Sequence, residues 1–114
     1  MNKKKTGNVW VFIEQDSGKI ADVSLELVCK AKELADELGV KTEGVVLGSG
    51  IKSLPSTLHE YGCDNVFLVD DERLQTFSAI PYTKIIVELV RKHKPNIFMF
   101  GATHVGRSVA PRIA

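Results

Sequence analysis

Four short runs of β-branched and aromatic residues alternate with helical segments along this chain. The runs span residues 9–14, 44–48, 65–70 and 96–100. Such continuous apolar runs are typical of strands that are buried on both faces. Between them, apolar residues recur at helical spacing, most clearly over about 22–38, where Leu27, Ala31, Leu34, Ala35 and Leu38 share one face. The chain is therefore expected to fold as βαβαβαβα.

Strands that alternate with helices form parallel sheets through right-handed crossovers, with helices on both faces. We therefore predict an α/β fold with an open parallel sheet, a Rossmann-like three-layer arrangement, and strand order 3-2-1-4. In this order the first and fourth strands are neighbours where the order reverses, and ligands bind beyond the carboxyl ends of strands at such a point. The predicted domain spans 9–114 after a flexible tail at 1–8. We expect it to be incomplete at its C-terminus, because "VAPRIA" stops at an apparent helix start.

Composition and charge narrow the classes of function. The chain has 114 residues, of which 44% are hydrophobic and 25% charged, with a net charge of +1. This charge does not indicate a nucleic-acid partner, and no apolar run is long enough to span a membrane. The chain lacks a secretory signal and a CxxC motif, so we expect a cytoplasmic, reduced protein. Cys29 and Cys63 are expected to be small core residues.

One stretch, "GATHVGRS" at 101–108, comes within one residue of a P-loop. A P-loop has Gly, four residues, Gly-Lys and then Ser or Thr, whereas this stretch has Arg107 in place of the lysine. It also follows the fourth strand instead of the first, and Pro111 removes an amide from the helix that comes next. Magnesium-dependent phosphate hydrolysis is therefore not expected. No nucleophile, base and orienting group can be assembled either, so the sequence does not indicate an enzyme.

Two interpretations of this stretch stay open. Gly101 and Gly106 can simply allow a tight turn, with Thr103 or Ser108 capping a helix that begins at or just before Ser108. Alternatively the loop belongs to a pocket or an interface, where Arg107 offers donors to a phosphate or carboxylate. Other candidates are weaker. Glu14 closes the first strand at the same sheet edge, and the acidic residues Asp70, Asp71 and Glu72 suit a solvated loop.

The segment "GATHVGRSVAPRIA" resembles the N-terminal domain of the electron transfer flavoprotein alpha subunit. Members of that family carry Gly-Ala-Thr, two residues, Gly-Arg, two residues, Ala-Pro-Arg, an aliphatic residue and Ala. The first strand and helix, and the "VVLG" of the second strand, are similar to the same domain. The resemblance covers about 9–114. It departs in length, because the family's FAD-binding C-terminal domain has no counterpart in this sequence.

The resemblance implies a subunit of an electron carrier and not an enzyme. In the family, a heterodimer of alpha and beta subunits carries electrons as reduced FAD from acyl-CoA dehydrogenase or a similar flavin dehydrogenase to an acceptor. Some members instead bifurcate electrons from NADH. The N-terminal domain acts as a scaffold that packs against the beta subunit, so this chain alone is not expected to hold the FAD. Gly101, Thr103, Gly106 and Arg107 match motif positions expected near a flavin or nucleotide held by the partner. The alternative is a stand-alone adenine-nucleotide-binding domain of the universal-stress-protein type.

Overall fold

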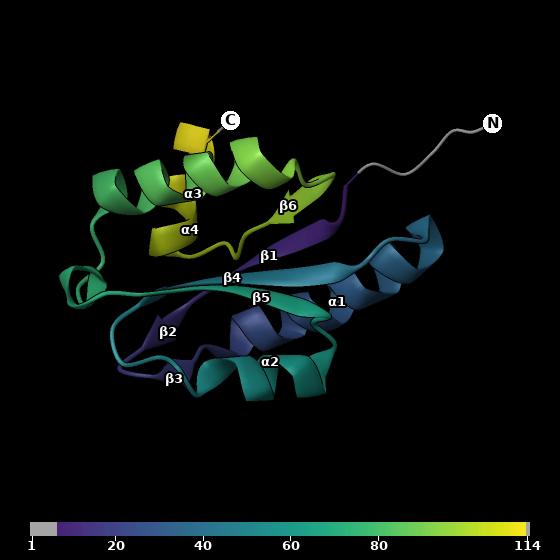
Figure 1. The fold of residues 1–114 in the computed structure, drawn as a ribbon, viewed down its shortest axis with the longest axis horizontal. Helices are drawn as coiled ribbons and strands as arrows, with labels where there is room; N and C mark the ends of the chain where they lie inside the picture. The colour runs from purple at the N-terminus through teal and green to yellow at the C-terminus, as the bar shows by residue number, and fades with distance from the viewer. Residues whose placement is uncertain (1–6, 114) are drawn as a thin grey trace.

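A four-stranded parallel sheet forms the centre of the molecule (Figure 1). The structure is a computed structural model that describes residues 7–113. The sheet has the order β5-β4-β1-β6. Its strands are β1 (Val9–Ile13), β4 (Thr42–Gly48), β5 (Asn65–Asp70) and β6 (Ile97–Met99). In chain order this is 3-2-1-4, so the predicted sheet and the pairing of the first with the fourth strand are both confirmed.

Two pairs of helices cover the two faces of the sheet. One face carries α1 (Asp22–Leu38) and α2 (Leu54–Tyr61), and the other carries α3 (Ala79–His93) and α4 (His104–Ile113). Figure 1 shows α3 and α4 above the sheet and α1 and α2 below it. The expected three-layer arrangement is confirmed. Within residues 7–113, no helix is long and apolar enough to cross a bilayer.

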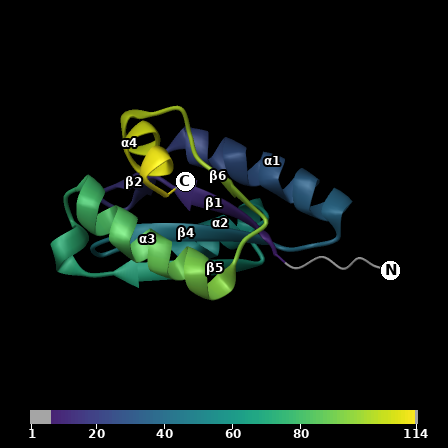
Figure 2. The ribbon, with the colours of Figure 1, turned by 90° about the horizontal axis from the view of Figure 1, so that it is seen from above.

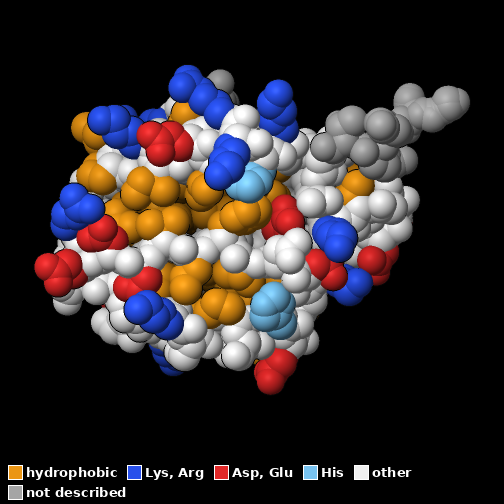
Figure 3. Space-filling model, in the orientation of Figure 1, with side chains coloured by type: hydrophobic (Ala, Val, Ile, Leu, Met, Phe, Trp, Pro, Cys, Tyr) orange, Lys and Arg blue, Asp and Glu red, His pale blue; other side chains and the backbone are white. Residues whose placement is uncertain are grey.

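Alternation along β1 divides its side chains between two cores. Val9, Val11 and Ile13 pack towards α1 and α2, while Trp10 and Phe12 pack towards α3 and α4. All five are at most 2% exposed, as expected for a central parallel strand with helices on both faces. By contrast β5 lies at the sheet edge with most of its side chains half-buried. In Figure 3 hydrophobic side chains surface on both sides of this edge strand.

The turn predicted after the first strand is a small hairpin. β2 (Gln15–Asp16) pairs antiparallel with β3 (Lys19–Ile20). Ser17 and Gly18 connect them with φ angles of 53° and 86°, the left-handed pair that a tight two-residue hairpin requires. The hairpin returns Ile20 to the core, where it is 8% exposed. Strands of two residues are too short to produce a periodic pattern, so the sequence signalled only the turn.

The two cysteines differ in environment. Cys63 is buried, and desolvation together with the nearby Asp64 and Glu43 carboxylates raises its pKa to about 12. Cys29 is exposed on α1. The prediction of a core position is therefore right for Cys63 and wrong for Cys29. The preceding residue, Val28, lies on the buried face of α1. Cys29, one residue further along the helix, therefore points away from that face.

Residues 1–6 of the predicted N-terminal tail lie outside the described residues. Asn8 joins the amino-terminal edge of the sheet through two hydrogen bonds. Its side-chain oxygen accepts from the Lys41 amide at 3.0 Å, and its carbonyl accepts from the Asn96 amide at 2.9 Å. These bonds tie the chain before β1 to the segments that precede β4 and β6.

Candidate functional site

The carboxyl ends of β1 and β6 meet at one edge of the sheet. Val9 is in register with Ile97 and Val11 with Met99, so the residue after β1 and the loop after β6 emerge side by side. A hydrogen bond of 2.7 Å from the Thr103 hydroxyl to the Glu14 carboxylate joins them. The structure thus brings Glu14 to the predicted glycine loop across a separation of 89 residues in sequence.

Thr103 is the N-cap of α4. Its Oγ1 accepts the Gly106 amide at 3.0 Å, and its carbonyl accepts the Arg107 amide at 2.8 Å. The helix begins at His104, earlier than the expected start at or just before Ser108. Of the two expected caps, Thr103 and Ser108, the structure shows Thr103. The Thr103 hydroxyl donates to Glu14 and accepts from the Gly106 amide of α4. It therefore holds the start of α4 next to the end of β1.

Gly106 allows α4 to approach the loop closely. It is buried, and a Cβ at this position would overlap the Gly101 carbonyl oxygen. Gly101 is less restricted, because a Cβ there would lie 3.2 Å from the Glu14 Oε2 atom and 3.3 Å from the Val23 Cγ2 atom, both in side chains. The glycine of the motif that is sterically required is thus Gly106.

Arg107 lies on the exposed side of the same turn. One of its terminal nitrogens donates to the Ala102 carbonyl at 3.0 Å, and it forms no ion pair with any residue between 7 and 113. A guanidinium carries five N–H donors. Most of them therefore remain available to another molecule, while the bond to Ala102 fixes the direction of the side chain.

The loop differs from a phosphate-binding loop in where its amide groups point. In a P-loop, backbone amides converge on the phosphates. Here the amides of Gly106 and Arg107 both bond to Thr103. Pro111 lies inside α4 and cannot donate to the Arg107 carbonyl. The donor set therefore fits a closed turn, not a cradle for the diphosphate of a flavin held by this chain alone.

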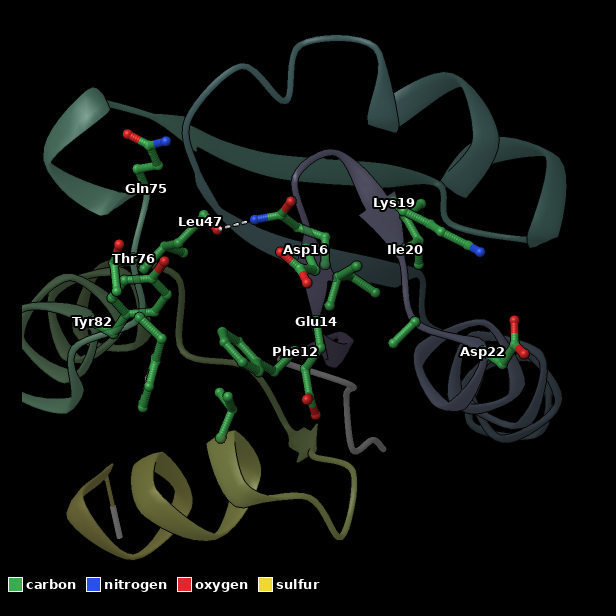
Figure 4. A pocket seen from close by; sticks show the side chains of 15 residues that line it. Phe12, Glu14, Asp16, Lys19, Ile20, Asp22, Leu47, Gln75, Thr76 and Tyr82 are labelled. Atoms are coloured by element: carbon green, nitrogen blue, oxygen red, sulfur yellow. Dashed lines mark hydrogen bonds between the residues drawn. The ribbon is translucent and has the colours of Figure 1, made fainter.

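A hollow of about 670 Å³ opens beside Glu14 at the carboxyl edge (Figure 4). Its apolar walls include Phe12, Leu47 and Phe77, and Asp16 and Lys19 of the hairpin stand on its polar side. The wall is held by two bonds to backbone carbonyls. Tyr82 donates to Leu74 at 2.6 Å and Gln15 donates to Leu47 at 3.3 Å. The sequence did not reveal this hollow, because the hairpin that forms one side of it was expected to be only a turn.

The acidic residues at the end of β5 stabilise local structure. Asp70 accepts the Gly50 and Ile51 amides, each at 3.0 Å. Asp71 pairs with the Arg73 guanidinium at 2.8 Å, and this hydrogen bonding lowers the pKa of Asp71 to about 2. Within the part of the chain that the structure describes, no group of three His, Cys, Asp or Glu side chains could hold a metal ion.

Replacing Thr103 with valine is expected to lower the free energy of unfolding by about 2 kcal/mol. Valine keeps the shape but removes both the helix cap, worth about 1 kcal/mol, and the charge-assisted bond to Glu14. Chemical denaturation of the two proteins measures the difference.

The control for this change is Thr103→Ser, which retains the hydroxyl and is expected to cost less than about 1 kcal/mol. In a double-mutant cycle, Thr103→Val and Glu14→Ala should be non-additive, because each removes the same bond. Additive effects would contradict a direct Thr103–Glu14 interaction.

The fold and this edge define a class: a Rossmann-like α/β domain whose glycine loop closes on itself and presents an arginine. The electron transfer flavoprotein domain model matches residues 9–114. The chain therefore belongs to the electron transfer flavoprotein family, as the resemblance of its last residues indicated.

Relatives in this family match the whole chain or nearly so. The electron transfer flavoprotein subunit alpha of Clostridium acetobutylicum is 45% identical over 100% of this chain. Protein FixB of Clostridium saccharobutylicum is 41% identical over the same span. The lactate dehydrogenase (NAD(+),ferredoxin) subunit LctC of Acetobacterium woodii is 35% identical. The chain spans only part of the length of these relatives: 34%, 34% and 27%, respectively.

Among solved structures, a universal stress protein from Archaeoglobus fulgidus has a similar fold. It superposes with a TM-score of 0.62, covering 92% of this chain and 91% of that protein, at 14% sequence identity. A likeness at this identity shows a shared fold and no more. The family match favours the electron-carrier interpretation over the stand-alone nucleotide-binding alternative.

Proposed function

We propose that this chain is the N-terminal domain of an electron transfer flavoprotein alpha subunit and acts as its scaffold and subunit-interface domain. The observation that carries the proposal is the family match over residues 9–114, together with alpha-subunit relatives that align along the whole chain. In the parent heterodimer, the FAD is held outside this domain. The domain itself contributes position and surface, and no catalytic group.

The β6–α4 loop is proposed as the contact with the beta subunit. Gly101, Thr103 and Gly106 close the loop into a fixed shape, so little conformational entropy is lost when a partner packs on it. Arg107 is exposed and directed by a single backbone bond. In this arrangement the guanidinium meets an acceptor of the beta subunit, close to a flavin or nucleotide that the partner holds.

The parent heterodimer is proposed to carry electrons between a flavin dehydrogenase, such as an acyl-CoA dehydrogenase, and an acceptor. The names of two relatives support this role in electron transfer. One is a subunit of a lactate dehydrogenase that uses NAD(+) and ferredoxin, and another is an acryloyl-CoA reductase electron transfer subunit of Anaerotignum propionicum, 36% identical over 94% of this chain. We further propose that the parent heterodimer bifurcates electrons from NADH through its flavins.

Arg107→Ala is expected to weaken association with the beta subunit about tenfold, which corresponds to about 1.4 kcal/mol. The measurement is a titration of the alpha subunit, carrying or lacking the change, with its purified beta subunit. Lys52→Ala is the matched control, because Lys52 is exposed in the loop before α2 on the other side of the sheet.

The outcomes separate the two parts of the proposal. Equal affinity of the Arg107→Ala and Lys52→Ala proteins would contradict the role of the loop while leaving the heterodimer intact. If the unchanged alpha subunit and the beta subunit elute separately in size-exclusion chromatography, the assignment as an interface domain is wrong.

A further inference from the structure

Charge is distributed unevenly along this chain. Residues 79–113 contain one acidic residue, Glu88, and six basic ones. The basic residues are Lys84, Arg91, Lys92, Lys94, Arg107 and Arg112. Residues 7–78 show the opposite balance, with thirteen acidic and six basic residues. The net charge of +1 therefore conceals a basic segment joined to an acidic one.

The fold turns this segment into a basic face. α3 and α4 pack side by side on one side of the sheet (Figure 1 and Figure 2), and all six basic side chains of this segment are exposed. Figure 3 shows blue side chains gathered along the upper margin of the molecule, where α3 lies. The ion pairs among residues 7–113, Lys32–Asp36 and Arg73–Asp71, lie elsewhere. The charge of the α3–α4 face is therefore not neutralised within the described chain.

A groove of about 430 Å³ runs between the two helices of this face. It is lined by Ile80, Thr83, Lys84, Val87, Glu88, Arg91 and Arg112. Ile80, Lys84, Val87 and Arg91 follow one another at helical spacing, so apolar and basic side chains alternate along one side of α3. Ile80 is 69% exposed, the largest value for a large hydrophobic residue in the described part of the chain.

We propose that the α3–α4 face docks an acidic segment of a partner protein. An apolar side chain of that segment packs on Ile80 and Val87, and flanking carboxylates lie beside Lys84, Arg91 and Arg112. Burial of exposed apolar surface supplies the attraction at the centre, and charge complementarity supplies orientation and a faster encounter. Arg107, which the proposed function uses, does not line this groove, so the inference does not depend on the proposed function.

Two observations favour a protein over a nucleic acid. Ile80 and Val87 give the groove an apolar centre, whereas nucleic-acid surfaces rely on phosphate contacts. Residues 7–78 also carry an excess of acidic side chains that would repel a long polyanion. A short acidic segment meets only the basic face.

The test uses the alpha subunit in complex with its beta subunit and a fluorescent synthetic helical peptide. One face of the peptide presents leucine flanked by glutamates, and in a second peptide lysines replace the glutamates. Fluorescence anisotropy should show binding of the acidic peptide that weakens as salt is added. Arg91→Glu and Lys84→Glu should each weaken this binding about tenfold. Ile80→Ser should weaken it with little change in its salt dependence.

Lys30→Glu is the matched control, because Lys30 is exposed on α1 at the opposite face of the sheet. It should leave binding unchanged. The proposal is overturned if Lys30→Glu and Arg91→Glu weaken binding equally, if the lysine peptide binds as well as the acidic one, or if neither peptide binds. Tighter binding of duplex DNA or of phosphatidylserine vesicles would also overturn it. So would self-association of the complex that Arg91→Glu abolishes, which would assign the face to a second copy.

Discussion

Replacing Gly106 with alanine is expected to lower the free energy of unfolding by about 3 kcal/mol. The added methyl group would overlap the Gly101 carbonyl oxygen, which is backbone and cannot rotate away. Relief requires α4 to move from the loop, and this movement would break the bond between the Gly106 amide and Thr103. Overpacking of this kind typically costs about 1–3 kcal/mol, and the lost cap adds to it. Urea denaturation followed by circular dichroism measures the change.

Gly101→Ala is the matched control for this substitution. It adds the same methyl group in the same loop, but the nearest atoms belong to the side chains of Glu14, Val23 and Thr103 at 3.2–3.4 Å. These side chains can shift by a few tenths of an ångström, so a cost below about 1 kcal/mol is expected. If both substitutions cost the same, close approach of α4 to the Gly101 carbonyl is not what requires a glycine at position 106.

This steric role changes the meaning of the motif. In the sequence, residues 101–108 match the P-loop pattern except at one position, where Arg107 replaces the lysine. In the structure, Gly106 brings a helix against its own loop, and the Thr103 hydroxyl occupies its amide. The same spacing of glycines thus lets the loop close against its own helix and does not form a phosphate-binding site. The arginine that follows is left on the outside, where the proposed interface uses it.

Most of the fold could be predicted from the sequence because each strand and helix carries its own signal. The run Val9–Ile13 is apolar on both faces, and a central parallel strand requires this pattern. The helix expected over about 22–38 spans Asp22–Leu38 in the structure. The hairpin at 15–20 could not be predicted in this way, since each of its strands has two residues.

The candidate site was predictable in location but not in its contacts. The topology alone places Glu14 and the loop 101–107 at one sheet edge. The bond between Glu14 and Thr103 depends on rotamers and on the first residue of α4, and helix starts are uncertain by a residue or more from sequence. The sequence offered both Thr103 and Ser108 as caps, and the coordinates identify Thr103.

Glu43→Ala is expected to lower the free energy of unfolding by about 3 kcal/mol. Glu43 is 6% exposed and accepts two hydrogen bonds, from Trp10 Nε1 at 2.9 Å and from Asn65 Nδ2 at 2.7 Å. These three residues are in register across β1, β4 and β5. Removing the carboxylate leaves the buried indole N–H without an acceptor, and hydrogen bonds to a charged group contribute about 1.5–3 kcal/mol each. Trp10 is the only tryptophan of the chain, so its fluorescence follows unfolding directly.

Two further substitutions assign this cost to the two donors. Asn65 is exposed, so its amide can bond to water, and Asn65→Ala should cost less than about 1 kcal/mol. Trp10→Phe removes the indole donor, and Glu43→Ala should then cost less in the Trp10→Phe background than in the unchanged protein. Trp10→Phe alone is also costly, because it leaves the buried Glu43 carboxylate with the Asn65 hydrogen bond and without the indole donor. If Glu43→Ala costs the same in both backgrounds, the hydrogen bond between Trp10 and Glu43 does not stabilise the sheet. Packing of Trp10 against Phe67 and Phe98 must then hold the strands in register.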